Sequence, residues 1–235
     1  MIPLKDRNPS STMPVVNVAL ILANTAAFLY ELMMPDRVEN AFVASYALIP
    51  AHVTHVLAGA HPSLQSAALP FFTSMFLHGG WLHLIGNMWF LWVFGDNVED
   101  RLGHISYLFF YLFCGFGAGL THVMMNLGSS TPTVGASGAI SGVLGAYIVL
   151  YPRAKVLTLV PLIIFWFTVD LPAFLILGYW FAIQFFSGIS SVGARAANGG
   201  VAYWAHIGGF VLGVIMVKLW PERPQRQWRT ASDGW

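Results

Sequence analysis

The chain has 235 residues, of which 57% are hydrophobic and only 9% are charged. Soluble domains carry about 25% charged residues, so this composition excludes an ordinary water-exposed globular surface. The formal net charge of +1 comes without a long basic run, which argues against nucleic acid as a partner, and a single cysteine excludes a disulfide framework. We therefore expect an all-α membrane protein in a lipid bilayer.

The apolar stretches divide the chain into candidate membrane spans. Residues 1–14 are too polar for a signal peptide and are expected to form a cytoplasmic N-terminal segment. A spanning helix needs roughly 20 mostly apolar residues. Six stretches fit this requirement, namely 15–33, 78–97, 104–126, 135–151, 171–188 and 202–219. We expect them to form one domain over 15–220, followed by a polar cytoplasmic tail at 221–235.

Two further segments do not fit a spanning helix. Residues 34–77 are too apolar for a free linker and too interrupted to span, so they are expected to lie partly in the outer membrane interface. Residues 156–169 are apolar but short, and they are followed by Asp170 and Pro172. We expect this stretch to be interfacial, or to form the tilted start of the next helix.

The basic residues give the expected orientation. With six spans and a cytoplasmic N-terminus, nine of the 11 Lys and Arg residues fall on the cytoplasmic side, as the positive-inside rule requires. A seventh span would move the basic tail at 221–235 to the outer side. The pattern therefore predicts a multi-pass protein with both termini in the cytoplasm. Because no segment of the sequence resembles a transit peptide, we expect the membrane to be a plasma (inner) membrane.

Polar residues gather at the outer ends of three of these spans. The second, fourth and sixth spans run in the same direction, and they place His83, Asn87, Ser137 and His206 at similar depth. His83 and Asn87 are four residues apart and share a helix face. Polar side chains inside a bilayer are costly, so they usually face the bundle interior and mark a functional site.

Small residues explain how these helices can approach one another. The fourth span carries Gly138, Gly142 and Gly145, and the sixth carries the GxxxG pair Gly209 and Gly213. Small residues let helix backbones pack closely in lipid. Ser137 and His206 can then be neighbours in space although they are 69 positions apart.

A serine beside a histidine indicates nucleophilic catalysis. A neutral imidazole within about 3 Å of a hydroxyl can take its proton as the oxygen attacks a carbonyl group. Asn87, His83 and the backbone N–H of Ser137 could donate hydrogen bonds to the resulting oxyanion. Asp170 is expected at the cytoplasmic end of the fifth span, too far away to complete a triad. The residues therefore predict a Ser–His dyad.

At these positions the sequence resembles the rhomboid intramembrane serine proteases, in their prokaryotic six-span form. The shared motifs are His83 and Asn87 on the second span, Gly135-Ala136-Ser137-Gly138 at the head of the fourth, and Ala205-His206 with two later glycines on the sixth. His78 and the stretch containing Glu99 and Arg101 are also similar to the family. The resemblance covers roughly residues 75–215.

The resemblance implies a six-transmembrane-helix bundle with serine endopeptidase activity. It implies that Ser137 is the nucleophile, that His206 is the general base, and that Asn87, His83 and His78 lie on the oxyanion side, with Gly135 and Gly138 flanking the nucleophile. Its substrates would be transmembrane proteins, cleaved near the outer end of their membrane helix, and no metal or cofactor is implied. Residues 189–201 would form a mobile cap, and the fifth span a lateral gate.

Two departures from the family pattern stand out. Four residues after the nucleophile, some members have an aromatic side chain that packs on the catalytic histidine, whereas this chain has Ser141. Residues 34–77 also lack the Trp-Arg pair found in many members. These departures leave open how His206 is supported and how the first loop is anchored.

Other functions were weighed against the protease. A metal site formed by His78, His83 and His206 is disfavoured because the chain has no HExxH motif. For a haem protein only His122 adds to the candidate ligands, and it is expected to be structural and near the inner end of its span. The alternative that stays open is a catalytically silent, rhomboid-like protein that binds membrane proteins.

Overall fold

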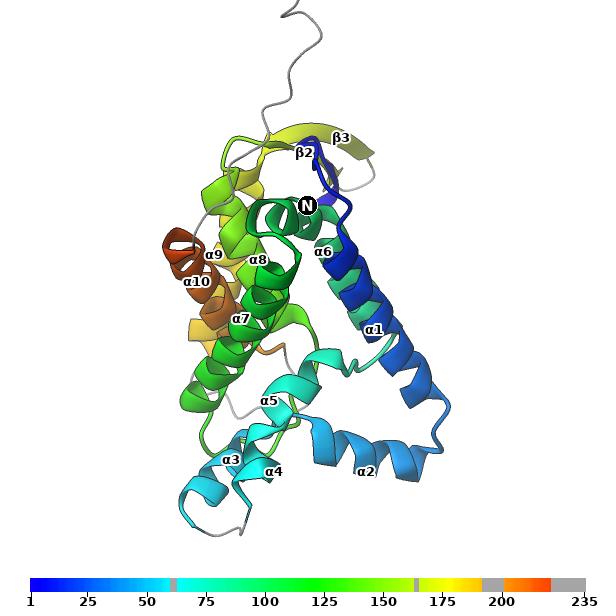
Figure 1. Ribbon diagram of the computed structural model, residues 1–235, viewed down its shortest axis with the longest axis vertical. Coiled ribbons are helices and arrows are strands. Elements are labelled where there is room, and N and C mark those ends of the chain that lie inside the picture. The colour runs from blue at the N-terminus through cyan, green and yellow to red at the C-terminus, as the bar shows by residue number, and fades with distance from the viewer. Residues whose placement is uncertain (60–62, 163–164, 192–200, 221–235) are drawn as a thin grey trace, which may run out of the picture.

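The computed structural model describes residues 1–59, 63–162, 165–191 and 201–220. In this part of the chain, long helices lie side by side, with a small sheet across one end and short helices across the other (Figure 1). The six longest helices are α1 (Val15–Leu32), α6 (Trp81–Leu102), α7 (His104–Met125), α8 (Ser137–Leu150), α9 (Ala173–Ser191) and α10 (Tyr203–Leu219). Each lies within a few residues of one of the predicted spans.

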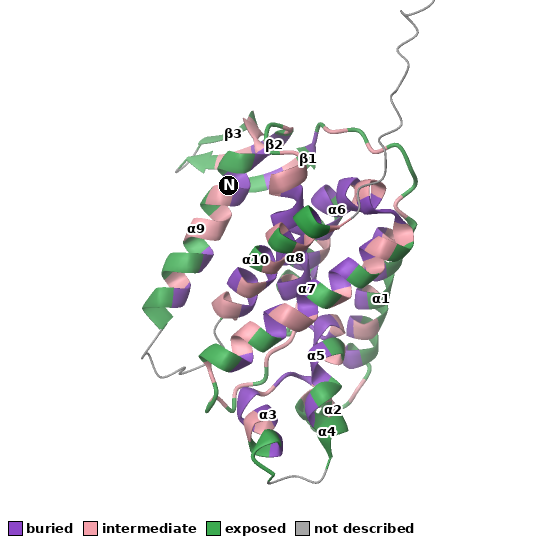
Figure 2. Cartoon of the chain, turned by 60° about the vertical axis from the view of Figure 1, so that its left-hand side comes forward, coloured by how far each residue is buried: buried purple, intermediate pink, exposed green. Residues whose placement is uncertain are grey.

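Three of the described helices, α1, α7 and α9, are long and apolar enough to cross a membrane. Helices α8 and α10 are equally apolar but shorter, and α6 carries charged residues in its last two turns. Buried residues gather where the helices face one another, and many outward-facing residues are exposed (Figure 2). Large apolar side chains such as Leu22, Phe113 and Phe186 point outward. That all six long helices cross a bilayer stays a prediction.

Residues 34–77, which form the first loop, contain short helices at the end of the bundle opposite the sheet (Figure 1). They are α2 (Asp36–Tyr46), α3 (Pro50–Leu57), α4 (Leu64–Ala68), α5 (Pro70–Thr73) and the 3₁₀ turn η1 (Ser74–Phe76). The loop is anchored without a Trp-Arg pair, because Leu48 and Thr133 pair through their backbones. The Thr73 hydroxyl also donates a hydrogen bond to the Tyr46 carbonyl at 2.7 Å.

The expectation of an all-α fold is wrong in one region. Strands β1 (Ile2–Asp6), β2 (Lys155–Leu162) and β3 (Phe165–Pro172) form an antiparallel sheet in the order β1-β2-β3. Residues 156–169 are therefore not the start of the next helix. Proline lacks a backbone N–H and disfavours a helix interior, and both β2 and β3 contain one. The N-terminal segment, predicted only to be polar and cytoplasmic, supplies the third strand.

A buried carboxylate fixes α1 against α6 at the sheet end. Glu99 is fully buried and accepts hydrogen bonds from the backbone N–H groups of Val16 at 2.9 Å and Asn17 at 2.7 Å. The first N–H groups of a helix lack partners within it and carry a partial positive charge, so an acidic side chain there is stabilising. His104, at the start of α7, contacts the same carboxylate. Glu99 thus joins the ends of three helices.

Glycines bring α8 and α10 into backbone contact. A Cβ atom at Gly209 would overlap the carbonyl oxygen of Gly138. In the same way, a Cβ atom at Gly213 would overlap the carbonyl oxygen of Gly142. The GxxxG pair therefore lies against the small-residue face of α8, as the sequence predicted. This contact sets the distance between the residues at the start of α8 and those in the first turn of α10.

We predict that Gly213→Ala lowers thermal stability, because the new methyl group must push α10 away from the backbone of α8. Overpacking of this kind costs roughly 1–3 kcal/mol. The matched control is Gly86→Ala on α6, where a Cβ atom would meet no atom within 4 Å. This control should be neutral or slightly stabilising, since alanine is a better helix former than glycine. Thermal unfolding of both variants in detergent tests the prediction, and equal shifts in melting temperature would contradict it.

Candidate active site

The structure brings Ser137 and His206 into hydrogen-bond contact. Ser137 is the first residue of α8, and His206 lies in the first turn of α10. The Ser137 Oγ and His206 Nε2 atoms are 2.8 Å apart. His206 is buried and the serine is half-buried. This arrangement is suitable for moving a proton from the hydroxyl to the imidazole.

The other face of His206 is held by two residues of α9 that the sequence analysis missed. His206 Nδ1 lies 2.8 Å from Gln184 Oε1. The Trp180 ring lies tilted against the imidazole, with ring centroids 5.8 Å apart. Gln184 is the only amide side chain in the predicted fifth span, and that isolated polar residue was the signal available in the sequence.

Trp180 provides the aromatic contact to His206 that Ser141 cannot provide. The Ser141 hydroxyl is fully buried and donates to the Ser137 carbonyl at 2.6 Å, one turn back along α8. This hydrogen bond engages the Ser141 hydroxyl with the backbone of its own helix. The aromatic partner of His206 comes instead from α9, a different helix from the one the family pattern suggests.

His83 and Asn87 converge on the peptide that precedes the serine. Gly135 has a φ of 121°, a backbone conformation that favours glycine. A Cβ atom there would lie 2.6 Å from His83 Nε2 and 3.5 Å from Asn87 Nδ2. The Asn87 amide nitrogen is buried and has no hydrogen-bond acceptor. A buried donor without a partner is unusual in a folded protein, and this one lies beside Gly135, two residues before Ser137.

Further donors are available on the same side of the site. His83 Nδ1 accepts a hydrogen bond from the Gly79 backbone N–H at 3.4 Å. In a neutral imidazole the opposite nitrogen then carries the proton, so His83 Nε2 is a donor toward Gly135. The backbone N–H groups of Ser137 and Gly138 begin α8 and have no acceptor within the helix. Helix N-termini favour bound anions.

His78 supports this group from a greater distance. Its ring centroid lies 5.1 Å from that of His83, in an edge-to-face arrangement. Its backbone N–H lies 3.4 Å from a carboxylate oxygen of Glu31, a buried acid that the sequence analysis also missed. His78 therefore contacts His83 and not Ser137 itself. Gly138 has a packing role, since a Cβ atom there would lie 2.7 Å from the Ala118 side chain.

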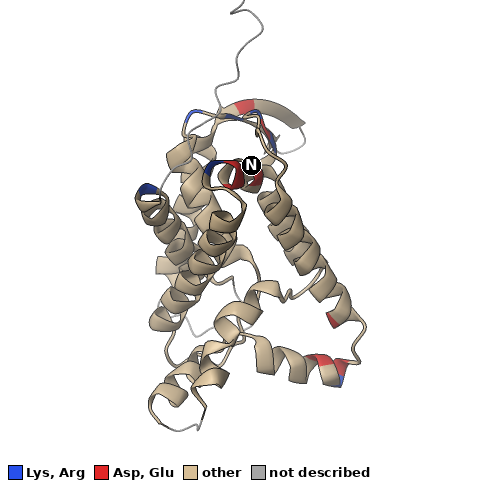
Figure 3. Ribbon diagram, viewed as in Figure 1, with Lys and Arg blue, Asp and Glu red and all other residues tan. Residues whose placement is uncertain are grey.

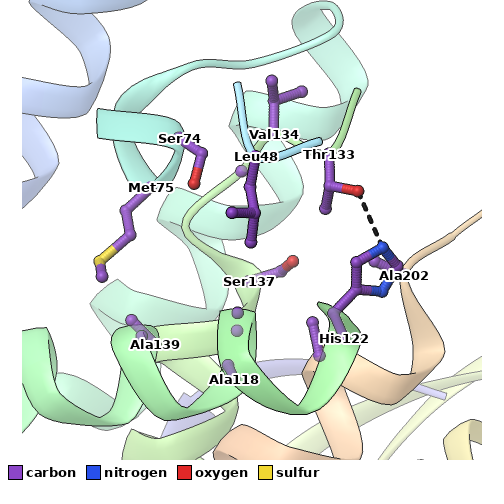
Figure 4. Close-up of a pocket in the computed structure, with 15 residues that line it drawn as sticks. Leu48, Ser74, Met75, Ala118, His122, Thr133, Val134, Ser137, Ala139 and Ala202 are labelled. Atoms are coloured by element: carbon purple, nitrogen blue, oxygen red, sulfur yellow. Dashed lines mark hydrogen bonds between the residues drawn. The ribbon is translucent and has the colours of Figure 1, made fainter. Parts of the chain in front are cut away.

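A pocket opens beside the serine hydroxyl. Leu48, Thr133 and His122 lie around the Ser137 side chain (Figure 4). His122 Nε2 is 2.9 Å from the Thr133 hydroxyl. The expected place of His122, near the inner end of its span, is wrong: α7 runs toward the site, so a residue in its last turn lies at the same end as Ser137.

Among the described residues, no carboxylate is hydrogen-bonded to Ser137 or His206. Asp170 belongs to β3 and pairs with Arg7 at 3.2 Å, at the sheet end of the molecule. In the part of the chain that the structure describes, no group of three His, Cys, Asp or Glu residues could hold a metal ion. Most of the expected cap over the site, residues 192–200, and the tail at 221–235 lie outside the described residues.

The arrangement agrees with a comparison against protein families. The Rhomboid domain matches residues 65–222, about two thirds of the chain. The chain belongs to the rhomboid family. As a rhomboid it is a multi-pass membrane protein, in agreement with its apolar helices.

Curated relatives support the same assignment. The chain is 31% identical to Rhomboid protein 1, mitochondrial, of Saccharomyces cerevisiae, over 60% of this chain and 39% of that protein. It is 30% identical to Rhomboid-like protein 11, chloroplastic, of Arabidopsis thaliana, over 66% of this chain and 53% of that protein. Rhomboid-like protease 5 of Toxoplasma gondii is 31% identical over 60% of this chain and 15% of that protein. The rhomboid thus aligns with about half or less of each of these relatives.

Proposed function

We propose that this rhomboid is an intramembrane serine endopeptidase that uses Ser137 and His206 to cleave transmembrane segments of other membrane proteins near their outer end. The observation that carries the proposal is the distance of 2.8 Å between the serine hydroxyl and the imidazole. A buried Asn87 amide without an acceptor lies beside them. A packing role for Ser137 would need neither feature.

We further propose that all six long helices cross a plasma (inner) membrane, with the sheet end in the cytoplasm. Six of the seven Lys and Arg residues in the described part lie at that end, and Arg37 lies at the other (Figure 3). This distribution follows the positive-inside rule. The active site then lies toward the outer face.

The length of α8 sets the depth of the nucleophile. The helix has 14 residues and is about 21 Å long, whereas the hydrocarbon core is roughly 30 Å thick. If Leu150 marks the cytoplasmic edge, Ser137 lies about 10 Å below the outer edge of the core. A substrate at that depth is a membrane segment, and its backbone must leave its helical hydrogen bonds before the serine can attack.

The proposed reaction proceeds through an acyl-enzyme. His206 Nε2 takes the Ser137 proton as Oγ adds to the scissile carbonyl carbon. When the C–N bond breaks, the imidazolium returns its proton to the leaving amine. A water molecule then attacks the ester while His206 takes one of its protons. When the second tetrahedral intermediate collapses, the imidazolium returns that proton to Ser137 Oγ and the carboxylic acid leaves.

The oxyanion formed in each addition needs hydrogen-bond donors. The backbone N–H of Ser137, the Asn87 amide and His83 Nε2 are the candidates, because they surround Gly135 beside the nucleophile. Donors already in place gain a partner only as charge develops on the substrate oxygen, and such groups typically contribute about 3–4 kcal/mol each to lowering the barrier. His78 would keep the His83 ring in position.

The first test is labelling of the purified protein with a fluorescent fluorophosphonate, which reacts covalently with activated serines. We expect label on the wild type and none on Ser137→Ala or His206→Ala, since the first lacks the nucleophile and the second lacks its base. Thermal unfolding of the three proteins controls for folding. A folded wild type that takes no label, and that leaves a transmembrane substrate uncut, would favour the silent binder.

A second test concerns the oxyanion. We predict that Asn87→Ala lowers kcat for cleavage of a transmembrane substrate by about 10²-fold with little change in KM, because a donor that acts only in the transition state is lost. The control is Ile85→Ala on the exposed side of the same helix, which should keep the wild-type rate. An unchanged kcat in Asn87→Ala would remove Asn87 from this role.

A further inference from the structure

The buried contact between Gln184 and His206 determines which imidazole nitrogen carries the proton. An amide oxygen can only accept a hydrogen bond. With Gln184 Oε1 at 2.8 Å, His206 Nδ1 must be the donor. The lone pair then lies on Nε2, the atom that faces the Ser137 hydroxyl. The reverse tautomer would point an N–H group at the serine and could not take its proton.

The same helix also fixes the plane of the imidazole ring. Trp180 precedes Gln184 by four residues, so the two side chains share one face of α9. Trp180 lies against the ring of His206, and Gln184 binds its edge. Packing restricts the tilt of the ring, and the hydrogen bond restricts its rotation about the Cβ–Cγ bond.

From these contacts we infer that Gln184 is a positioning residue that holds His206 as the Nδ1–H tautomer. Gln184 would then be an uncharged third residue beside Ser137 and His206, in the position that a carboxylate occupies in other serine hydrolases. The inference rests on the proposed function. It assigns to α9 a direct part in preparing the base. A carboxylate at this position would be costly in a bilayer, whereas an amide supplies the acceptor without a charge.

The test compares Gln184→Met, which keeps the side-chain length but removes the acceptor, with Gln184→Glu, which restores an acceptor and adds a charge. We expect Gln184→Met to slow fluorophosphonate labelling by about tenfold, the effect of losing one hydrogen bond. Gln184→Glu should recover the rate and move the acidic limb of the pH–rate profile to higher pH, since a nearby carboxylate stabilises the imidazolium. A purely structural role would leave that limb in place.

Controls separate this inference from the proposed function. His83 and His122, the other titratable side chains near His206, are unchanged in all variants, and Phe186→Leu on the exposed side of α9 should label like the wild type. Equal labelling rates for the wild type and Gln184→Met would overturn the inference alone, as would an unshifted profile in Gln184→Glu. A wild type without label would overturn the proposed function as well.

A second, independent observation concerns the sheet. One face of the sheet packs on the ends of the helices. Val156 and Thr158 of β2 lie on this face and are fully buried. On the same face, Asp6 accepts hydrogen bonds from the Tyr147 hydroxyl at 2.6 Å and from the Asn97 amide at 2.8 Å. This face therefore points along the helix axes, into the bundle.

Farther along β2 and β3 the same face extends past the helices. Alternation along β2 places Leu162 on the face of Val156 and Thr158, and the strand register pairs Leu162 with Phe165 and Val160 with Phe167. Leu162, Phe165 and Phe167, which we name the overhang, are 57%, 70% and 48% exposed. Three large apolar side chains thus point along the helix axes, and the described part of the chain leaves them largely exposed.

The surroundings of the overhang indicate what covers it. At the other end of β3, α9 begins with the exposed side chains of Phe174 and Leu175, and this helix is apolar enough to cross a membrane. Lys5 and Lys155 are exposed at the other end of the sheet, where β2 begins. A sheet that carries large apolar side chains at one end and cations at the other suits the boundary between acyl chains and anionic headgroups.

We propose that the overhang lies in the cytoplasmic interface of the bilayer, with its aromatic side chains among the acyl chains and the lysines near lipid phosphates. This position would fix the level of the sheet relative to the membrane. The proposal does not depend on catalysis, and its test needs no substrate.

The single cysteine makes a direct measurement practical, because Cys114 is fully buried. A polarity-sensitive thiol probe is attached to Phe167→Cys or to Thr168→Cys, its neighbour on the opposite face of β3. The proteins are placed in vesicles of phosphatidylcholine and phosphatidylglycerol in equal parts. We expect the probe at 167 to show blue-shifted emission, quenching by lipid-attached nitroxide and loss of iodide quenching, and the probe at 168 to remain open to iodide.

Two results would overturn the proposal. Equal iodide quenching at both positions would place the overhang in water. Protection from iodide at 167 without quenching by the lipid nitroxide would show that protein covers the overhang, as in contact between two copies of the chain. Phe165→Cys, on the same face, repeats the measurement should the variant at 167 fail to fold.

Discussion

The close approach of α8 and α10 is the constraint on which the proposed site depends. Carbonyl oxygens of Gly138 and Gly142 occupy the space where Cβ atoms of Gly209 and Gly213 would lie. Lipid offers no hydrophobic force to drive two apolar helices together, so backbone packing of this kind holds them. Because α8 begins at Ser137, this packing fixes a contact of 2.8 Å between two residues 69 positions apart.

The two ends of the bundle differ in whether their buried polar atoms have hydrogen-bond partners. At the sheet end, Glu99 and Asp6 have several hydrogen-bond partners each. At the other end, Asn87 Nδ2, His78 Nε2 and Glu31 Oε1 are buried among the described residues without one. An unsatisfied buried group costs about 1–3 kcal/mol. The satisfied network holds the helices in register, and this allows the site to keep unpaired donors ready for a substrate.

The sequence predicted the helices and the dyad because both depend on local, recognisable patterns. Long apolar runs mark spans, and Ser137 and His206 stand out as polar residues beside glycines at one depth. Sheet formation could not be predicted in this way. Strand β2 pairs with residues 2–6, 150 or more positions away, and an apolar run at 156–169 has no period that separates strand from helix. Gln184 and Trp180 were missed for a related reason, since neither belongs to a motif and their role appears only once α9 packs on α10.

These two residues change the physical description of the dyad. Ser137 and His206 belong to the tightly packed pair α8 and α10, whereas α9 has few fully buried residues, chiefly Ala173 and Leu177 near the sheet. In the proposed mechanism, the proton-accepting tautomer of His206 therefore depends on a helix that has few fully buried side chains. A movement of α9 away from α10 would release the imidazole before it disturbed the glycine contacts. Readiness of the base and the position of α9 are thus coupled through one hydrogen bond.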